Sequence, residues 1–375
     1  MRIDLAANFA LLLLPLTCHS FSCLDGNGSA RDWWLIRQLP ELSDSANIRY
    51  RRHEKHGVYY FLHQDDEDPD ELHPTNILER KNNPLMTTLR PFYGNASARS
   101  SDTFLLAYND NDMTINGRGI SKGFIMYSKK TGTGVWLLHS AKSFLGEFED
   151  NHSHKKYFSA SLVPDDVLLK GQTYLCLSFL EDQLPKMIEV LNTTRPIETY
   201  WHIGQNLWKD FGFVTELTSS TDTENEIMST MWRLQIADKS RFDVFLRTGA
   251  GGLKFDVYKS ILAPYYKTDI FVQSSVPHPE SAENVELSKW ACFGEYKVHN
   301  ITQIRYGYGI MLVDNPHLKD DSKYAYTESG YVCISDYDRR PEHLLSPGVV
   351  VCTRHKRRMY NHYVRTQGRR SYCEP

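Results

Sequence analysis

The sequence contains few cysteines, no sustained apolar run beyond its N-terminus and no large excess of either charge. Its 375 residues include only 7 cysteines, which excludes a small domain held together mainly by disulfides. After the first segment, no stretch approaches the roughly 20 apolar residues that a membrane-spanning helix needs. The formal net charge of -3 gives the chain as a whole no general attraction for a polyanion. The length suits two domains or one large fold, at roughly 150 residues per domain.

The N-terminus carries an apolar run that predicts the compartment. Leu5 to Leu16 are almost entirely apolar and follow Arg2, and small residues stand at Cys18 and Ser20. About a dozen apolar residues are too few to cross a hydrocarbon layer of roughly 30 Å, so this pattern indicates a cleaved signal peptide over residues 1–20. We therefore expect a secreted protein.

The cysteines and the glycosylation sequons agree with secretion. Removal of Cys18 with the signal peptide leaves an even number of cysteines, which favours disulfides whose pairing the sequence leaves open: Cys23, Cys176, Cys292, Cys333, Cys352 and Cys373. No CxxC pair occurs, so no zinc site built from cysteine is expected, and we predict no metal. Sequons spread along the chain predict glycosylated surface loops at Asn27, Asn95, Asn151, Asn192 and Asn300.

Short apolar runs bounded by turn residues predict strands, with fewer helices between them. The expected strands cover residues 103–108, 123–128, 134–140, 173–179, 270–274 and 308–313, with a hairpin loop at 129–133. A weaker helical periodicity favours helices over residues 180–191, 224–239 and 255–263. Strands interleaved with a few helices predict a mixed α/β or α+β protein.

Six short segments form an ordered set along the chain. They are Tyr108-Asn109-Asp110, Ser121-Lys122-Gly123, Gly134 to Ser140, Gly171 to Cys176, Asp321-Ser322-Lys323 and Cys333 to Asp336. Each segment resembles one of the deoxyribonuclease II family, and their order and spacing hold across essentially the whole mature chain. No single segment is specific, but six in order are. The sequence is similar in particular to secreted nematode homologues of that family.

The resemblance implies a fold and a disulfide pattern. The fold is phospholipase D-like, with two α/β halves, here residues 21–195 and 196–375, related by a pseudo-twofold axis. Each half contributes one H-x-K motif to a single shared cleft. The implied disulfides are Cys23–Cys176, Cys292–Cys373 and Cys333–Cys352.

The resemblance also implies a chemistry that needs no metal or other cofactor. The family cleaves DNA at acid pH, in lysosomes or outside the cell: one histidine attacks phosphorus, a second protonates the leaving oxygen, and the lysines neutralise phosphate oxygens. Because positions i and i+2 of a strand share a face, histidine and lysine can reach the same phosphate.

This chain departs from that pattern at both histidines. The first motif has Ile120, which offers no nucleophile, acid or base, and the second has Asp321, which at an ordinary pKa near 4 would be ionised and would repel phosphate. Lys122, Lys323 and His139, which matches a third histidine of the family's site, remain. Deleting the analogous groups of a hydrolase costs about a millionfold in rate, so we predict an inactive homologue.

Residual positive charge suggests a ligand. Lys122 and Lys323 are expected to bind DNA or another polyanion in the cleft, and a basic C-terminal segment is expected to help through Arg354, Lys356, Arg357 and Arg358. Binding is expected to strengthen at acid pH as His139 gains charge. A solvated basic face without a ligand is the alternative for this segment.

The sequence leaves three functions open. The first is a secreted, glycosylated, non-catalytic homologue that binds nucleic acid, another polyanion or an extracellular protein partner. The second is an active acid endonuclease that uses other residues, with His152, His154 and His317 as substitutes for the missing histidines. The third is a secreted antigen or partner-binding glycoprotein with no ligand in the old cleft.

Overall fold

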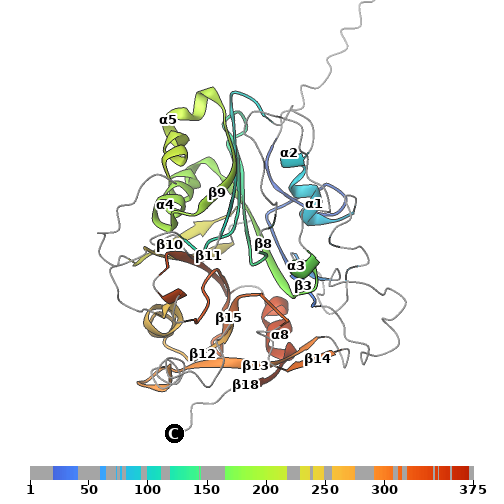
Figure 1. Cartoon of the computed structure of the whole chain (residues 1–375), viewed down its shortest axis with the longest axis vertical. Helices are drawn as coiled ribbons and strands as arrows, with labels where there is room; N and C mark the ends of the chain where they lie inside the picture. The colour runs from blue at the N-terminus through green and yellow to red at the C-terminus, as the bar shows by residue number, and fades with distance from the viewer. Residues whose placement is uncertain are drawn as a thin grey trace, which may run out of the picture.

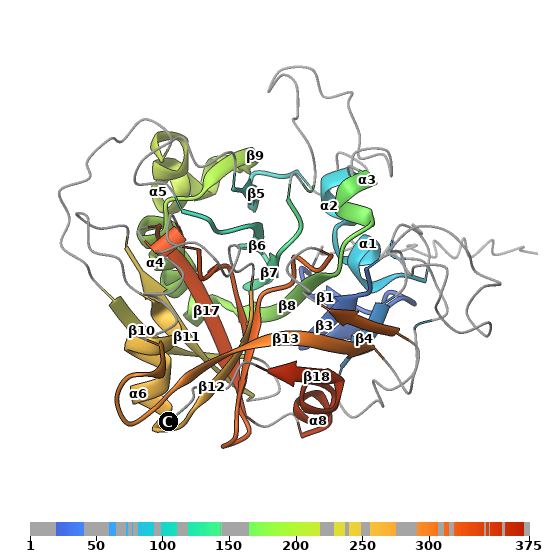
Figure 2. The same cartoon turned by 60° about the horizontal axis from the view of Figure 1, so that its bottom comes forward.

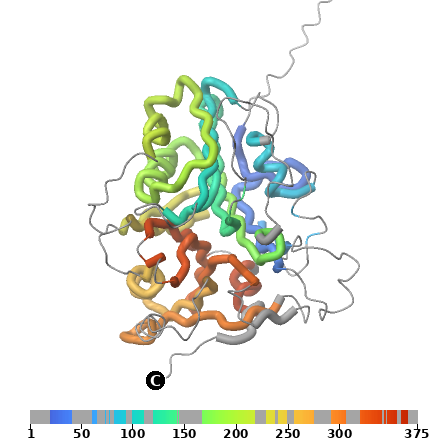
Figure 3. Tube along the Cα trace, viewed as in Figure 1, coloured from blue at the N-terminus to red at the C-terminus, as the bar shows by residue number. Residues whose placement is uncertain are grey.

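The structure is a computed structural model, and the residues it describes are coloured in Figure 3. They are residues 20–40, 60–64, 73, 77, 82–93, 99–110, 119–142, 144, 165–217, 229–236, 240–248, 256–274, 291–306, 311–314, 319–340, 343–344, 346–354 and 357–370. The expected signal peptide lies outside the described residues, apart from Ser20. Within the described residues, no helix has the length and apolar character needed to cross a membrane.

Two large β-sheets dominate the molecule, and a two-stranded sheet of β1 (Cys23–Leu24) and β2 (Ala30–Arg31) lies beside the first (Figure 1). The first large sheet has the order β4-β3-β8-β7-β6-β5-β9. Its strands are β3 (Trp33–Gln38), β4 (Tyr60–His63), β5 (Thr103–Asn109), β6 (Gly123–Ser128), β7 (Thr133–His139), β8 (Gln172–Leu180) and β9 (Ile197–Ile203).

The second large sheet has the order β10-β11-β17-β16-β15-β12-β13-β14, with β18 paired to β13. Its strands are β10 (Ser229–Gln235), β11 (Arg241–Arg247), β12 (Ile270–Gln273), β13 (Val298–Tyr306), β14 (Met311–Asp314), β15 (Tyr324–Thr327), β16 (Val332–Ser335), β17 (Gly348–Thr353) and β18 (Gln367–Arg370).

Helical segments are short and lie on the faces of the sheets. They are α1 (Pro84–Thr88), α2 (Arg90–Tyr93), α3 (Asp165–Leu168), η4 (Glu181–Gln183), α4 (Leu184–Thr194), η5 (Gln205–Leu207), α5 (Trp208–Phe211), η6 (Gly212–Glu216), η7 (Tyr258–Leu262), α6 (Ala263–Tyr266) and α8 (Arg357–Thr366).

The two sheets repeat one arrangement. The run β3-β8-β7-β6-β5 of the first sheet corresponds to β11-β17-β16-β15-β12 of the second, and all pairs within both runs are antiparallel. The repeat extends to single hydrogen bonds: the His139 amide donates to the Lys122 carbonyl at 3.2 Å, and the Ser335 amide donates to the Lys323 carbonyl at 3.0 Å. Both motif lysines therefore precede equivalent strands. The expected mixed α/β fold with two related halves is confirmed.

The core has three parts because each sheet is covered on both faces. One apolar cluster fills the space between the sheets, where α4 and α8 also pack (Figures 1 and 2). A second cluster lies under α1, α2 and α3 on the other face of the first sheet. A third lies under η7 and α6 on the outer face of the second sheet. Because both faces of β5 and β6 are buried, these strands appear in the sequence as continuous apolar runs.

The two sheets do not divide at residue 195, where the sequence placed the boundary. Strand β9 pairs with β5 of the first sheet, with Ile203 opposite Phe104. The following helical segment stays there too, because the rings of Phe104 and Phe211 stack at 3.8 Å. The first unit therefore continues to about Leu217, where the described stretch ends.

The helix expected over residues 224–239 is wrong in its described part. Ser229–Gln235 form the edge strand β10, antiparallel to β11. Its outward residues alternate with residues that face α4, where the Thr230 hydroxyl donates to the Glu189 carboxylate at 3.2 Å. The prediction mistook apolar residues that alternate every two positions for the period of a helix. Pairing with β11 determined the strand conformation despite a weak local preference for helix. The other expected strands and helices are present, although residues 308–310 of the expected 308–313 strand are not described.

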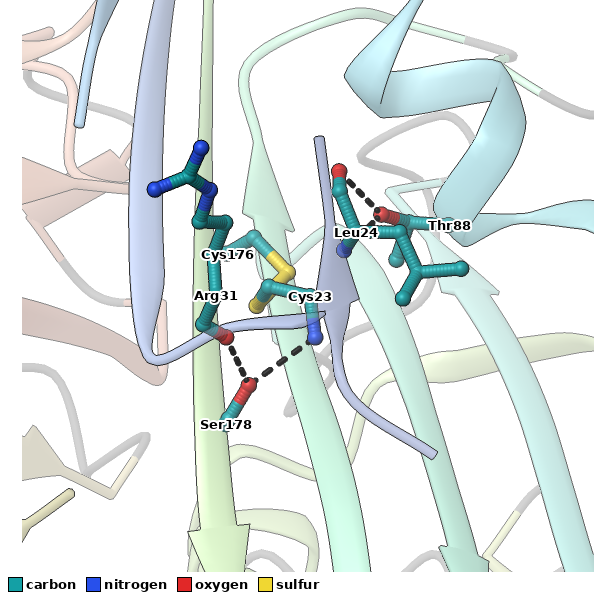
Figure 4. Close-up of a disulfide and its surroundings, with 6 residues drawn as sticks. All are labelled: Cys23, Leu24, Arg31, Thr88, Cys176 and Ser178. Carbon is teal, nitrogen blue, oxygen red and sulfur yellow. Dashed lines mark hydrogen bonds between the residues drawn. A yellow bond between two sulfur atoms is a disulfide. The ribbon is translucent and has the colours of Figure 1, made fainter. Parts of the chain in front are cut away.

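Two of the implied disulfides are present in the structure, Cys23–Cys176 and Cys333–Cys352. Cys292 is also disulfide-bonded, and its expected partner Cys373 lies outside the described residues. Figure 4 shows how the first bridge attaches β1 to β8. The Ser178 hydroxyl accepts from the Cys23 amide at 2.9 Å and donates to the Arg31 carbonyl at 2.7 Å (Figure 4).

We expect the two bridges to stabilise the fold unequally. Their cysteines are 153 and 19 residues apart. In the chain-entropy model, Cys23→Ala with Cys176→Ala should lower the free energy of unfolding by about 5 kcal/mol, and Cys333→Ala with Cys352→Ala by about 3 kcal/mol. Denaturant titration of the two variants measures the difference. The reverse order would show that native-state packing, not loop closure, sets the effect of each bridge.

Candidate functional site

The first motif is held between the two halves of the molecule. The Gly119 amide donates to the Arg195 carbonyl at 3.2 Å, and the Ile120 amide donates to the Pro347 carbonyl at 3.1 Å. A Cβ atom on Gly119 would lie 2.0 Å from the Thr194 carbonyl oxygen, so only glycine fits there. The Ile120 side chain is buried in the apolar cluster on the outer face of the second sheet. The position at which the resemblance implies a histidine is here part of the core.

The second motif is held in the reciprocal way by the first half. The Gly171 amide donates to the Lys319 carbonyl at 2.9 Å, and the Asp321 amide donates to the Gly171 carbonyl at 2.8 Å. A Cβ atom on Gly171 would lie 2.5 Å from the carboxyl carbon of Asp320. The Asp321 carboxylate lies 3.2 Å from the ammonium of Lys170, which also belongs to the first half. Asp321 is thus an ion-pair partner across the two halves.

Each motif lysine is buried beside its own carboxylate. Lys122 Nζ lies 2.5 Å from Asp110 Oδ2 and donates to the Ile120 carbonyl at 3.1 Å. Lys323 Nζ lies 3.0 Å from Asp338 Oδ2. The exposed fractions of Lys122 and Lys323 are 0% and 3%. The expectation that these lysines present free positive charge to a ligand is therefore wrong, because both are enclosed and neutralised.

The two motifs meet in one electrostatic cluster. Burial lowers the pKa of Lys122, Asp110 opposes that shift, and the charge of Lys323 adds to it. Burial would also lower the pKa of Lys323, but Asp338 and Asp110 hold it above its usual value. Each lysine thus senses charges that belong to the other half of the molecule.

Asp336 is the unbalanced acid of this cluster. Burial raises its pKa to about 7, against the opposing charges of Lys122 and Lys323 and the nearby Ser121 hydroxyl. Together with His139 and Ser140 it lines a narrow crevice. The positive charges of Lys122 and Lys323 are balanced by the carboxylates of Asp110 and Asp338. The net charge of the site is therefore neutral when Asp336 is protonated and negative when it is ionised.

His139 is enclosed by aromatic rings. The centroids of Phe144, Phe124 and Tyr174 lie 5.1, 5.4 and 6.1 Å from that of its imidazole. Burial, and then the charge of Lys122, lower the pKa of His139 well below its ordinary value. Burial thus disfavours the charged form of the ring, contrary to the expectation that His139 gains charge in acid solution. The substitute histidines His152, His154 and His317 lie outside the described residues.

Arg354, the described exposed residue of the basic segment, is separate from this cluster. Strand β17 starts beside the first motif and ends at Thr353, and the exposed Arg354 follows it. At about 3.3 Å per residue, Arg354 is roughly 20 Å from the motif end of the strand. Arg357 and Arg358 open α8, and Lys356 is not among the described residues. The motif lysines and Arg354 therefore do not form one surface.

The described sequons differ in their surroundings. Asn27 is exposed in the turn between β1 and β2, and Asn192 is exposed in the last turn of α4. Asn300 lies inside β13, where its side-chain oxygen accepts a hydrogen bond from the buried guanidinium of Arg339. Asn95 and Asn151 are outside the described residues.

Sequence reasoning missed the acids that accompany the lysines. Asp110 lies in a segment that the sequence singled out, directly after β5, which was a usable signal. Asp338 and His343, whose Nδ1 lies 3.0 Å from Asp338 Oδ2, had no comparable signal because no spacing connects them to Lys323. Within the described residues, no group of three or more His, Cys, Asp or Glu side chains is arranged to hold a metal.

Known proteins resemble the chain over most of its length. A family model described as deoxyribonuclease II matches residues 22–370. Cell death-related nuclease 6 of Caenorhabditis elegans is 24% identical over 355 residues, which cover 91% of this chain and 86% of that protein. Deoxyribonuclease-2-alpha of Rattus norvegicus is 24% identical over 357 residues, covering 92% of each. A solved phosphatidylserine synthase of Haemophilus influenzae covers 67% of this chain and 62% of its own, but its TM-score of 0.28 and 9% identity are too low to argue from.

The raised pKa of Asp336 predicts how stability depends on pH. Because its folded-state pKa of about 7 lies above the ordinary value of 3.8 for an aspartate, its contribution is fully present below about pH 4 and is lost as pH rises through about 7. Relative to Asp336→Asn, the wild type should lose up to about 4 kcal/mol of unfolding free energy across that window. Denaturant titrations at several pH values measure the difference.

Asp338→Asn is the matched control, with the opposite sign. Charges of Lys323 and His343 hold the pKa of Asp338 below its usual value despite burial, so its contribution is present above about pH 4 and is lost at lower pH. Removing this carboxylate should cost about 3–5 kcal/mol at neutral pH, because Lys323 would remain buried without it. If both variants shifted the pH profile in the same direction, the assignment of the two carboxylates would be wrong.

Proposed function

Since this chain belongs to the deoxyribonuclease II family, we propose that it is a member that no longer cleaves DNA and acts by binding. The observation that carries this proposal is the fate of the two motif positions. Ile120 is core, and Asp321 pairs with Lys170 across the two halves. Neither position retains a group that can attack phosphorus or protonate a leaving oxygen.

The remaining groups of the site support the same conclusion. The lysines are already neutralised by Asp110 and Asp338, and Asp336 adds negative charge above neutral pH. A phosphodiester entering this site would therefore meet no net positive charge. The neutral His139 is surrounded by aromatic rings. The former active site thus serves to join the two halves.

Binding, in this proposal, is carried outside the former active site. The protein is secreted and glycosylated, and it binds nucleic acid or another polyanion through the basic C-terminal region that begins at the exposed Arg354. Exposure and distance from the enclosed lysines favour this region over Lys122 and Lys323. An extracellular protein partner without nucleic acid is the alternative.

Purified protein should not nick supercoiled plasmid between about pH 4 and 7 in the presence of a chelator, because both groups of the covalent mechanism are missing. Replacement of both residues, Ile120→His with Asp321→His, should recover at most a small fraction of cleavage, because Lys122 and Lys323 remain paired with Asp110 and Asp338. The matched control is the same pair with glutamine, which cannot form a phosphohistidine. Nicking by the unmodified protein that His139→Ala abolishes would show that the chain is an active nuclease.

Glycan occupancy should follow the surroundings of each asparagine. Secreted protein from a eukaryotic host should lose the mass of one glycan in Asn27→Gln and in Asn192→Gln, because both side chains are exposed. Asn300→Gln should leave the mass unchanged, because a glycan would have to fit beside Arg339 inside β13. Intact-mass spectrometry distinguishes these cases. A glycan at Asn300 would contradict the packing of that strand.

A further inference from the structure

The outer face of the second sheet carries an exposed patch of aromatic and cationic side chains. We define it as the aromatic–cationic patch, made of Arg233, Arg241, Tyr265, Tyr266, Tyr331 and Arg354. We propose that this patch binds single-stranded nucleic acid, with bases stacked on Tyr265 and on the guanidinium of Arg354. This inference specifies the ligand and the site of the binding function proposed above, and it does not depend on loss of cleavage.

The strand register places the patch on one face and at one end of the sheet. Val332 is opposite Thr353, so Tyr331 and Arg354 are neighbours at the end of the β16–β17 ladder. The Thr353 hydroxyl donates to the Arg241 carbonyl at 3.4 Å, which brings Arg241 to the same end. Because side chains alternate along strands, these residues share the face that carries the Cys333–Cys352 bridge.

Contacts between rings, and between a ring and a cation, connect the members into one surface. The Tyr265 and Tyr266 ring centroids are 4.9 Å apart, and those of Tyr266 and Tyr331 are 3.9 Å apart. The guanidinium carbon of Arg354 lies 5.6 Å from the Tyr331 centroid. Both of the first two tyrosines belong to α6, which lies beside β10 and β11 at this end of the molecule (Figure 2). The patch therefore contains a row of three neighbouring tyrosine rings, with the guanidinium of Arg354 at one end.

The surface is accessible and its charge suits phosphate. Tyr265 is 40% exposed, and Arg241 and Arg354 are exposed. The Asp243 carboxylate inside the patch is already bonded, by Arg233 Nε at 3.0 Å and by the Tyr266 hydroxyl at 3.1 Å. Among the described residues of this region, Asp243 and the exposed Glu328 of the β15–β16 turn stand against Arg233, Arg241 and Arg354. The balance of these described charges is therefore positive by one, although the whole chain is slightly acidic.

The chemistry favours a single strand over a duplex. Exposed aromatic rings and arginine planes bind unpaired bases by stacking, and flanking cations follow the phosphate backbone. In a duplex the base faces are already stacked on one another, so only the cations would contribute. The patch is also preorganised: the Cys333–Cys352 bridge joins the two strands that carry Tyr331 and Arg354, two residues from each. Less ordering entropy is then lost on binding.

The test is fluorescence anisotropy of the full-length protein with labelled oligothymidylate of about 15 nucleotides, a length within the range that one such surface covers. A chelator prevents metal-dependent cleavage, and a salt titration separates stacking from phosphate contacts. Tyr265→Ala should weaken binding about fivefold or more with an unchanged salt slope, while Tyr265→Phe should bind normally. Arg354→Gln should weaken binding and reduce the slope of log affinity against log salt by about 0.7.

Matched controls come from the first half, where Trp208 and Lys209 are exposed in α5. Trp208→Ala and Lys209→Gln remove one exposed ring and one exposed cation, and both should bind like wild type. The proposal is overturned if the oligonucleotide does not bind, if these controls weaken binding as much as the patch variants do, or if a duplex binds as tightly as the single strand. Plasmid nicking is measured separately, so failure of the patch and failure of the non-catalytic function are distinguishable.

Discussion

Burial of two lysines at the junction of the halves is the constraint on which the structure around the old motifs depends. A buried ammonium is tolerated only with a carboxylate beside it, since neither ion can recover its hydration otherwise. Asp110 accompanies Lys122 and Asp338 accompanies Lys323. These pairs fix the chain segments that precede β6 and β15, the equivalent strands of the two sheets. The internal symmetry of the fold therefore has its counterpart in a pair of buried ion pairs.

The same junction is compatible with the proposed loss of cleavage, because its backbone contacts do not depend on catalytic side chains. Each motif is held by backbone hydrogen bonds to the other half, through Pro347 on one side and Gly171 on the other. Those bonds need no particular side chain at the motif's first position. Ile120 could therefore join the apolar cluster and Asp321 could pair with Lys170 while the strands remained in place. In the proposed function, the catalytic groups are replaced while the frame that positioned them is kept.

Charge in this protein is separated by depth. Inside, lysines and aspartates cancel, and the protonation of Asp336 leaves the site neutral or negative, which disfavours a phosphate there. Outside, Arg354 and Arg241 stand at the far end of the second sheet, beside exposed aromatic rings. The net charge of -3 for the whole chain indicates neither the balanced charges inside nor the exposed arginines outside. Interaction with a polyanion is a property of where the charges lie rather than of their sum.

Local sequence patterns were enough to predict most strands and the resemblance to a family. They also showed that neither motif begins with a histidine. Each of these features depends on only a few consecutive residues. The patterns failed over residues 224–239, where pairing of β10 with β11 decided between strand and helix. They also placed the boundary too early, because β9 returns to the first sheet.

The partners of the lysines could not be obtained from the sequence either. Asp338 is fifteen residues from Lys323 along the chain, and only the turn between β15 and β16 and the strand that follows bring the two together. The sequence by itself determined that neither motif begins with a histidine, since that depends on residue identity. Only the tertiary structure decided that the remaining lysines are neutralised and that the exposed cations lie elsewhere, because burial and ion pairing depend on contacts between residues far apart in the chain.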